Sequence, residues 1–197
     1  MKTTFDHAQH DTNYDNTYTE ETGMTSIVSY PTRCRLWGNA RFRGNCDGRL
    51  FKNLVLRYGA TRVADPMMGS GTTRDVINGL NGTGRYNIHY WGADLRSGFD
   101  LRTDSLPGPF NFLWLHPPYW NIIRYRDDDP RDLSTCSTYE QYCSVLRQCL
   151  RNCYQAIAPN GRLAILVGDV RRKGAYIPIV RDVLALSLIH ISEPTRH

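Results

Sequence analysis

The sequence has no long apolar run and no leader-like segment. None of its hydrophobic stretches approaches the roughly 20 residues that a membrane-spanning helix needs. The first residues, up to Thr25, are polar and acidic and contain no apolar core of the kind found in signal peptides. We therefore expect a cytoplasmic protein that does not have the membrane as a partner.

Metal-binding cysteine patterns are also absent from the sequence. The six cysteines include no C-x-x-C pair and no histidine at a zinc-binding spacing. We therefore expect free thiols, as is usual in a reducing compartment, and no metal site.

The composition is that of a globular protein with basic clusters. The chain has 197 residues, of which 41% are hydrophobic and 22% charged, and its net charge is +5. These values predict one domain of ordinary size. Arginines crowd residues 33–62, 124–131 and 171–173. Such clusters suit a phosphate backbone, although each could also be an ordinary solvated surface.

The ends of the chain differ in character from its middle. Residues 1–26 have no apolar period and predict a disordered segment, so the folded domain is expected over residues 27–185. Leu186 to Arg196 resembles the translation of a transposon-based sequencing adapter, which makes residues 186–197 a non-native tail. The alternative for this tail is a natural C-terminal strand, because it alternates weakly between apolar and polar residues.

Hydrophobic periodicity predicts alternating strands and helices. Strands are expected at 63–64, 87–93, 110–115 and 162–168, and helices at 49–58, 72–80, 139–158 and 177–184. This alternation predicts an α/β fold with a doubly wound, mostly parallel sheet. Ligands of such sheets bind beyond the carboxyl ends of the strands.

Two of these strands end in chemically specialised turns. Residues 62–73 read RVADPMMGSGTT, in which a short strand stops at small residues with accessible backbone N–H groups and a helix follows. Residues 112–120 read FLWLHPPYW, in which a strand stops at an imidazole, a rigid Pro-Pro unit and an aromatic ring. A Gly-x-Gly turn alone is weak evidence, but the ordered pair is specific.

The pair resembles the cofactor and catalytic loops of the S-adenosylmethionine-dependent DNA amino-methyltransferases. The resemblance covers about residues 33–184. It implies a Rossmann-like sheet, S-adenosylmethionine as cofactor and double-stranded DNA as partner, with the target base flipped out of the duplex. The reaction implied is methyl transfer to an exocyclic amino group, N6 of adenine or N4 of cytosine. It also implies that the sheet lacks its last strands, which would be encoded past Ala185.

The resemblance assigns the glycine turn to the cofactor. Asp65 would lie near its amino group, and Gly69 to Gly71 near its carboxylate and ribose. The implied binding residues of this loop are Asp65, Pro66, Met67, Gly69, Ser70, Gly71 and Thr72. The family usually has an aromatic residue in place of Met67. The alternative is a purely structural strand-to-helix turn.

Further acidic residues complete the implied cofactor site. Asp94 ends a strand, where a carboxylate can accept both ribose hydroxyls, or can cap a helix. Asp100, in preference to Asp104, would meet the adenine amino group. Phe51 and residues 43–46 loosely match the upstream element that contacts the cofactor in this family.

The second loop carries the implied chemistry. Because the lone pair of an exocyclic amine is delocalised into its ring, acceptors out of the ring plane must hold the amino hydrogens. His116 and the Pro117 carbonyl are the implied acceptors, and Pro118 stiffens the turn. Tyr119 would stack on the flipped base and Trp120 would line its pocket. Arg124 and Arg126 are the expected contacts to the nucleic acid.

His116 departs from the family, which usually has Asp, Asn or Ser there. Imidazole accepts a hydrogen bond only when neutral, so we expect activity to fall as pH drops through an ordinary histidine pKa near 6.5. The departure leaves the target base open between adenine and cytosine. The alternatives are an RNA base amine or a protein glutamine amide as substrate, a binding module that has lost turnover, and a Pro-Pro turn without chemistry.

Overall fold

The structure is a computed structural model that describes residues 25–172 and 174–191. The predicted disordered segment 1–26 therefore lies almost wholly outside the described residues. In chain order the elements are α2 (Gly48–Arg57), β1 (Arg62–Asp65), α3 (Thr72–Gly82), β2 (His89–Gly92), η1 (Leu95–Ser97), β3 (Phe110–Leu115), η2 (Leu133–Thr135), α4 (Tyr139–Gln155), β4 (Ile157–Ile165), β5 (Val170–Arg172), β6 (Ala175–Ile177) and α5 (Ile179–Ile191).

The main sheet is parallel and has the strand order β2-β1-β3-β4. This confirms the predicted α/β class. The chain leaves β1 toward β2 on one side and then returns to place β3 on the other side of β1. In open sheets of this kind, such a reversal opens a crevice at the carboxyl ends of the two strands, where ligands bind. The two specialised turns follow β1 and β3.

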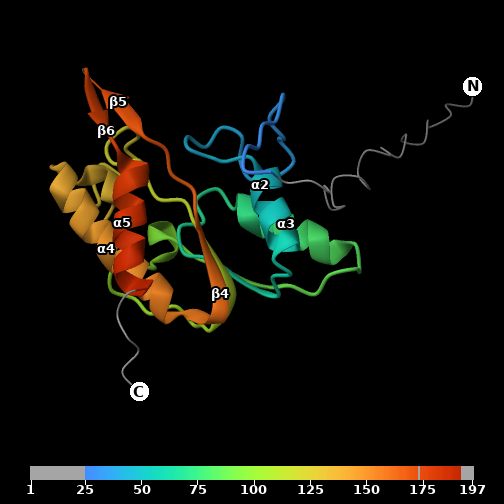
Figure 1. Cartoon of the computed structure of the whole chain (residues 1–197). Helices are drawn as coiled ribbons and strands as arrows, with labels where there is room; N and C mark the ends of the chain where they lie inside the picture. Colours follow the sequence, from blue (N-terminus) through green and yellow to red (C-terminus); the bar gives the residue numbers. More distant parts are fainter. Residues whose placement is uncertain (1–24, 173, 192–197) are drawn as a thin grey trace, which may run out of the picture.

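Helices cover both faces of the sheet, as Figure 1 shows, with α2 and α3 on one side and α4 and α5 on the other. Successive side chains of a strand point to opposite faces of its sheet, and the side chains of β3 show what each face packs against. Phe112 and Trp114 pack toward α2 and α3, whereas Leu113 and Leu115 pack toward α4 and α5. All four side chains are buried, and burying each stabilises the fold by about 1.5–3 kcal/mol.

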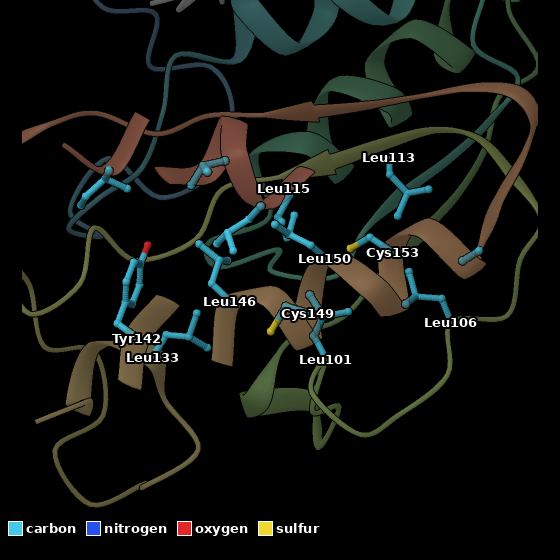
Figure 2. Close-up of a cluster of buried hydrophobic side chains, with 14 of the residues drawn as sticks. Leu101, Leu106, Leu113, Leu115, Leu133, Tyr142, Leu146, Cys149, Leu150 and Cys153 are labelled. Carbon is cyan, nitrogen blue, oxygen red and sulfur yellow. The ribbon is translucent and has the colours of Figure 1, made fainter. Parts of the chain in front are cut away.

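The core on the α4 side shows the helical stripe that the sequence predicts. Leu146, Cys149, Leu150 and Cys153 of α4 are buried in one cluster with Leu113 and Leu115 of β3, and Figure 2 shows Leu146 and Leu150 beside Leu115. The described cysteines are free thiols, and burial raises the pKa of Cys149 to about 12. The buried cysteines of α4 therefore act as apolar packing groups.

The C-terminal part differs from the expectation in three places. Helix α4 ends at Gln155, not Ala158, because Ile157 already pairs with Phe110 of β3. Residues 170–172 and 175–177 pair as an antiparallel hairpin that periodicity did not reveal. Helix α5 continues to Ile191, so the described part of the tail is helical and the alternative of a C-terminal strand is wrong there.

Strand β4 lies at an edge of the described sheet. Its residues are half-buried or exposed, whereas β3 is almost wholly buried. Further strands beyond β4 stay a prediction. Within the described ranges, no helix is both long and apolar enough to cross a bilayer.

Candidate functional site

The turn after β1 is held by a buried carboxyl group. Asp65 is 2% exposed; its Oδ1 accepts from the Met67 amide at 3.1 Å, and its Oδ2 accepts from the Thr73 hydroxyl at 2.6 Å. Burial raises the pKa of Asp65 to about 7, and the nearby Asp94 charge also acts to raise it. Asp65 therefore fixes the shape of the turn as well as lining the space beside it.

The glycines of this turn serve its backbone conformation. Gly69 and Gly71 have φ of 56° and 84°, a left-handed region that favours glycine. A Cβ on Gly69 would lie 3.2 Å from the Phe42 ring, and one on Gly71 would lie 2.6 Å from the Arg74 guanidinium. A side chain at either position would therefore meet protein side chains first.

A cavity opens where β1, β2 and β3 end, and we call it the first cavity. The sequence-predicted residues that line it are Asp65, Pro66, Met67, Gly69, Ser70, Thr72, Asp94, Asp100, His116, Pro118 and Arg126. Gly71 is not among its lining residues, because it is buried beneath the turn as the residue that precedes α3. The two motifs therefore meet in one space.

Asp94 has the capping role and also lines the first cavity, so the ribose role stays a prediction. Its Oδ1 accepts from the amides of Arg96 and Ser97 in a capping box for η1. Its Oδ2 lies 3.7 Å from the Arg96 side chain, and the residue lines the first cavity. A carboxylate has about four acceptor positions, so the cap leaves Asp94 able to accept ligand hydroxyls.

Asp100 lines the first cavity, whereas Asp104 does not. The Asp100 carboxylate is held by Arg102, whose Nη2 donates to Oδ2 at 2.7 Å and whose Nε donates to Oδ1 at 2.9 Å. These hydrogen bonds lower the pKa of Asp100. Asp104 instead accepts from the Asp100 amide at 2.7 Å. The preference for Asp100 over Asp104 therefore agrees with the geometry, although most of its acceptor capacity is used.

The upstream segment contributes to the cavity, but Phe51 does not. Gly44, Asn45 and Cys46 line the first cavity, and Asn45 accepts a hydrogen bond from the Thr72 hydroxyl. Phe51 is fully buried and packs edge-on against Phe112 and Trp114. The expected cofactor contact of Phe51 is wrong, because its apolar ring belongs to the core beneath α2.

His116 stands between the first cavity and a second one. This second cavity, of about 980 Å³, is lined by His116, Pro117, Tyr119, Tyr125, Gly44, Asn45, Cys46, Asp47, Val28, Tyr30, Leu50, Ile122, Ile123 and Leu166. Five of these residues, among them His116 and Tyr125, line both cavities. The walls of the second cavity are mostly aromatic and aliphatic, which suits a flat heterocycle.

The environment of His116 keeps its imidazole neutral. Burial at the end of β3 lowers its pKa to about 4, because the charged form loses its solvation. The Tyr119 ring lies edge-on to it, with centroids 5.7 Å apart. The expectation of a neutral histidine agrees with this shift, and the pKa lies below the 6.5 of an unperturbed ring because His116 is buried.

The Pro-Pro unit is anchored from α4. The hydroxyl of the buried Tyr142 donates to the Pro118 carbonyl at 2.8 Å. Pro118 lines the first cavity and Pro117 the second. The turn therefore separates the two cavities and is fixed by a hydrogen bond from the core.

Trp120 lies outside the lining of both cavities, contrary to the expectation. Its φ of 49° turns the chain, and its Nε1 donates to the Cys136 carbonyl at 3.0 Å. The ring packs edge-on against Tyr139 of α4, with centroids 5.6 Å apart. A buried indole N–H needs a hydrogen-bond acceptor, and the Cys136 carbonyl supplies it on this side of the turn.

The two arginines expected to contact substrate are placed differently. Arg124 is exposed, lies 3.5 Å from Asp127 and lines neither cavity. Arg126 lines the first cavity, where it lies 3.7 Å from Asp129. Neither arginine lines the second cavity.

Sequence reasoning missed an aromatic contact that closes the wall between the cavities. The Phe42 and Tyr125 rings stack with centroids 5.7 Å apart, and the Arg96 guanidinium lies over the Phe42 ring, 4.6 Å from its centroid. A Cβ on Gly44 would lie only 2.0 Å from the Tyr125 hydroxyl. The sequence signal for this contact is that Phe42 and Tyr125 each lie within an arginine-rich stretch.

No model of a known protein family matches this chain, and no curated protein matches it in sequence. Among the described residues, no group of histidines, cysteines and carboxylates could hold a metal ion.

Proposed function

We propose that this protein is an S-adenosylmethionine-dependent DNA methyltransferase with a Rossmann-like methyltransferase fold. Its proposed target is an exocyclic amino group, N6 of adenine or N4 of cytosine. The single observation that carries the proposal is the position of His116. It lies in the wall shared by a cavity that contains the glycine turn and a cavity that contains the Pro-Pro-Tyr unit.

The first cavity fits the proposed cofactor. It presents carboxylates to hydroxyl and amino groups, chiefly those of Asp65 and Asp94, and apolar side chains to a flat ring, chiefly Leu95 and Phe99. Bound S-adenosylmethionine would supply an electrophilic methyl group on a sulfonium sulfur. Alignment of donor and acceptor is then the main requirement, and no metal is needed.

The second cavity fits a flipped base. Tyr119 offers a ring for stacking, and Ile122, Ile123 and Leu166 offer apolar walls. Neutral His116 accepts one amino hydrogen, and the Pro117 carbonyl accepts the other. Both acceptors hold the amine so that its lone pair turns toward the first cavity, which is electrostatic preorganisation. The buried hydrogen bond from Tyr142 to Pro118 keeps this turn fixed.

The test measures transfer from radiolabelled S-adenosylmethionine to DNA, RNA and protein in separate reactions, followed by nucleoside analysis of the DNA. We expect label in DNA alone, as N6-methyladenine or N4-methylcytosine. Label only in RNA or protein, or none anywhere with cofactor bound, would contradict the proposal.

A pair of variants locates the substrate site. Tyr119 lines only the second cavity, so Tyr119→Ala should abolish transfer and leave the calorimetric affinity for S-adenosylhomocysteine unchanged. Tyr58→Ala removes an exposed tyrosine outside both cavities and should affect neither. Equal transfer by both variants would place the base elsewhere.

A further inference from the structure

The β5–β6 hairpin presents basic and aromatic side chains to solvent. Arg171 pairs with Tyr176 across the hairpin, and its guanidinium lies 5.7 Å from the centroid of the tyrosine ring. Tyr176 is 56% exposed, and Arg171 and Arg172 are exposed as well. Asp169 anchors the base of the hairpin, because it accepts from the Tyr176 hydroxyl and from the Val180 amide. Figure 1 shows the hairpin projecting from the body of the molecule.

A hydrogen-bonded pair ties this hairpin to the second cavity. The Arg172 guanidinium donates to the Asn121 side chain at 2.5 Å and to its carbonyl at 3.3 Å. The next residue, Ile122, lines the second cavity. The hairpin therefore holds Asn121, whose neighbour in the sequence lines the cavity that we assign to the base.

A second arginine reaches the same cavity from the N-terminal segment. The exposed Arg33 donates to the Asn45 carbonyl at 2.7 Å, and Asn45 lines the second cavity. In Figure 1 this blue segment and the hairpin lie at the same end of the molecule. By contrast, the loop that carries Arg124 offsets its basic charge with Asp127 and Asp128.

We propose that Arg171 and Arg172 of the hairpin, together with Arg33, bind the phosphates of duplex DNA on either side of the flipped base. The inference rests on the proposed DNA substrate and names the surface that holds it. Guanidinium groups bind phosphate oxygens through paired hydrogen bonds, and such bonds fix the register of a protein on a duplex. A basic surface of this kind fits a negatively charged partner, and Arg33 and Arg172 each hold a residue that lines or adjoins the second cavity.

The test is the salt dependence of DNA binding, measured by fluorescence anisotropy with a labelled duplex. The main variant is Arg171→Gln, because it leaves the hydrogen bonds between Arg172 and Asn121 in place. The slope of log K against log salt concentration should become shallower by about 0.9 for each phosphate that is no longer neutralised. Arg33→Gln should have the same effect. Arg171→Lys keeps the charge and should keep the slope, and Arg151→Gln removes an exposed arginine of α4 as a matched control.

The outcomes separate this inference from the proposed function. Unchanged S-adenosylhomocysteine affinity and cooperative unfolding show that each variant is folded. Methyl transfer to DNA with equal slopes in the parent, Arg171→Gln and Arg151→Gln would overturn the hairpin surface and leave the function standing. A shallower slope for Arg171→Gln without methyl transfer by the parent would support the surface and overturn the function. Absence of DNA binding by the parent overturns the surface.

Discussion

Protonation of His116 is the perturbation for which the structure gives the most definite number. Its pKa is lowered from the ordinary 6.5 to about 4 by burial. At pH 5 an ordinary histidine would be only about 3% neutral, whereas a pKa of 4 leaves about 90% of the rings neutral and able to accept a hydrogen bond. We therefore expect single-turnover methyl transfer at pH 5 to keep nearly its full rate, with loss only near pH 4.

The direct assay is a nuclear magnetic resonance titration of the histidine ring protons. The chain has six histidines, and the signal missing from His116→Asn identifies the one of interest. This variant also supplies the activity control, because asparagine accepts hydrogen bonds without titrating. A His116 midpoint near 6.5, with activity falling in parallel and His116→Asn active at pH 5, would refute the reasoning from burial.

The same shift has a consequence for stability. Between pH 4 and 6.5 the unfolded state binds the His116 proton more strongly, so the free energy of unfolding rises with pH through this window, by about 3 kcal/mol. Asp65 acts in the opposite direction, since its pKa is raised from 3.8 to about 7. Its contribution is present at low pH and is lost as pH rises from about 4 to 7. Each variant lacks the titrating group, so the difference in the free energy of unfolding between parent and variant, measured with urea against pH, should rise with pH for His116→Asn and fall with pH for Asp65→Asn. Identical profiles for parent and variants would contradict both.

Two further predictions concern the walls of the cavities. Tyr142→Phe leaves the part-buried Pro118 carbonyl without its donor, so it should destabilise the protein by about 1 kcal/mol and lower the Tm by roughly 2–4 °C, whereas Tyr58→Phe should change neither. Gly44→Ala would displace the Tyr125 hydroxyl from its place in the wall that both cavities share, so calorimetric affinity for S-adenosylhomocysteine should fall roughly tenfold. The control is Gly84→Ala, because Gly84 has a similar φ of 70° but its added Cβ would meet nothing within 4 Å. Equal affinities of the two variants for S-adenosylhomocysteine would rule out a role for Tyr125 in cofactor binding.

Much of the fold could be predicted because local patterns report burial directly. The strand Phe110–Leu115 and the stripe along α4 follow from which residues are apolar and how they repeat. The β5–β6 hairpin could not be predicted in this way. Its short strands are largely exposed and carry arginines, so they have no apolar period to detect.

The candidate site, like the fold, could be predicted from the sequence only in part. The sequence by itself determined that two specialised turns follow two strands, and that an imidazole stands where it must be neutral in order to accept a hydrogen bond. It did not determine which way Trp120 faces, which arginines are held by neighbouring acids, or that Phe42 and Tyr125 stack across the wall of the cavities. Those outcomes depend on partners distant in the sequence, such as the Cys136 carbonyl for Trp120. Only the tertiary structure decided them, because burial and hydrogen-bond satisfaction are properties of the packed neighbourhood and not of a local segment.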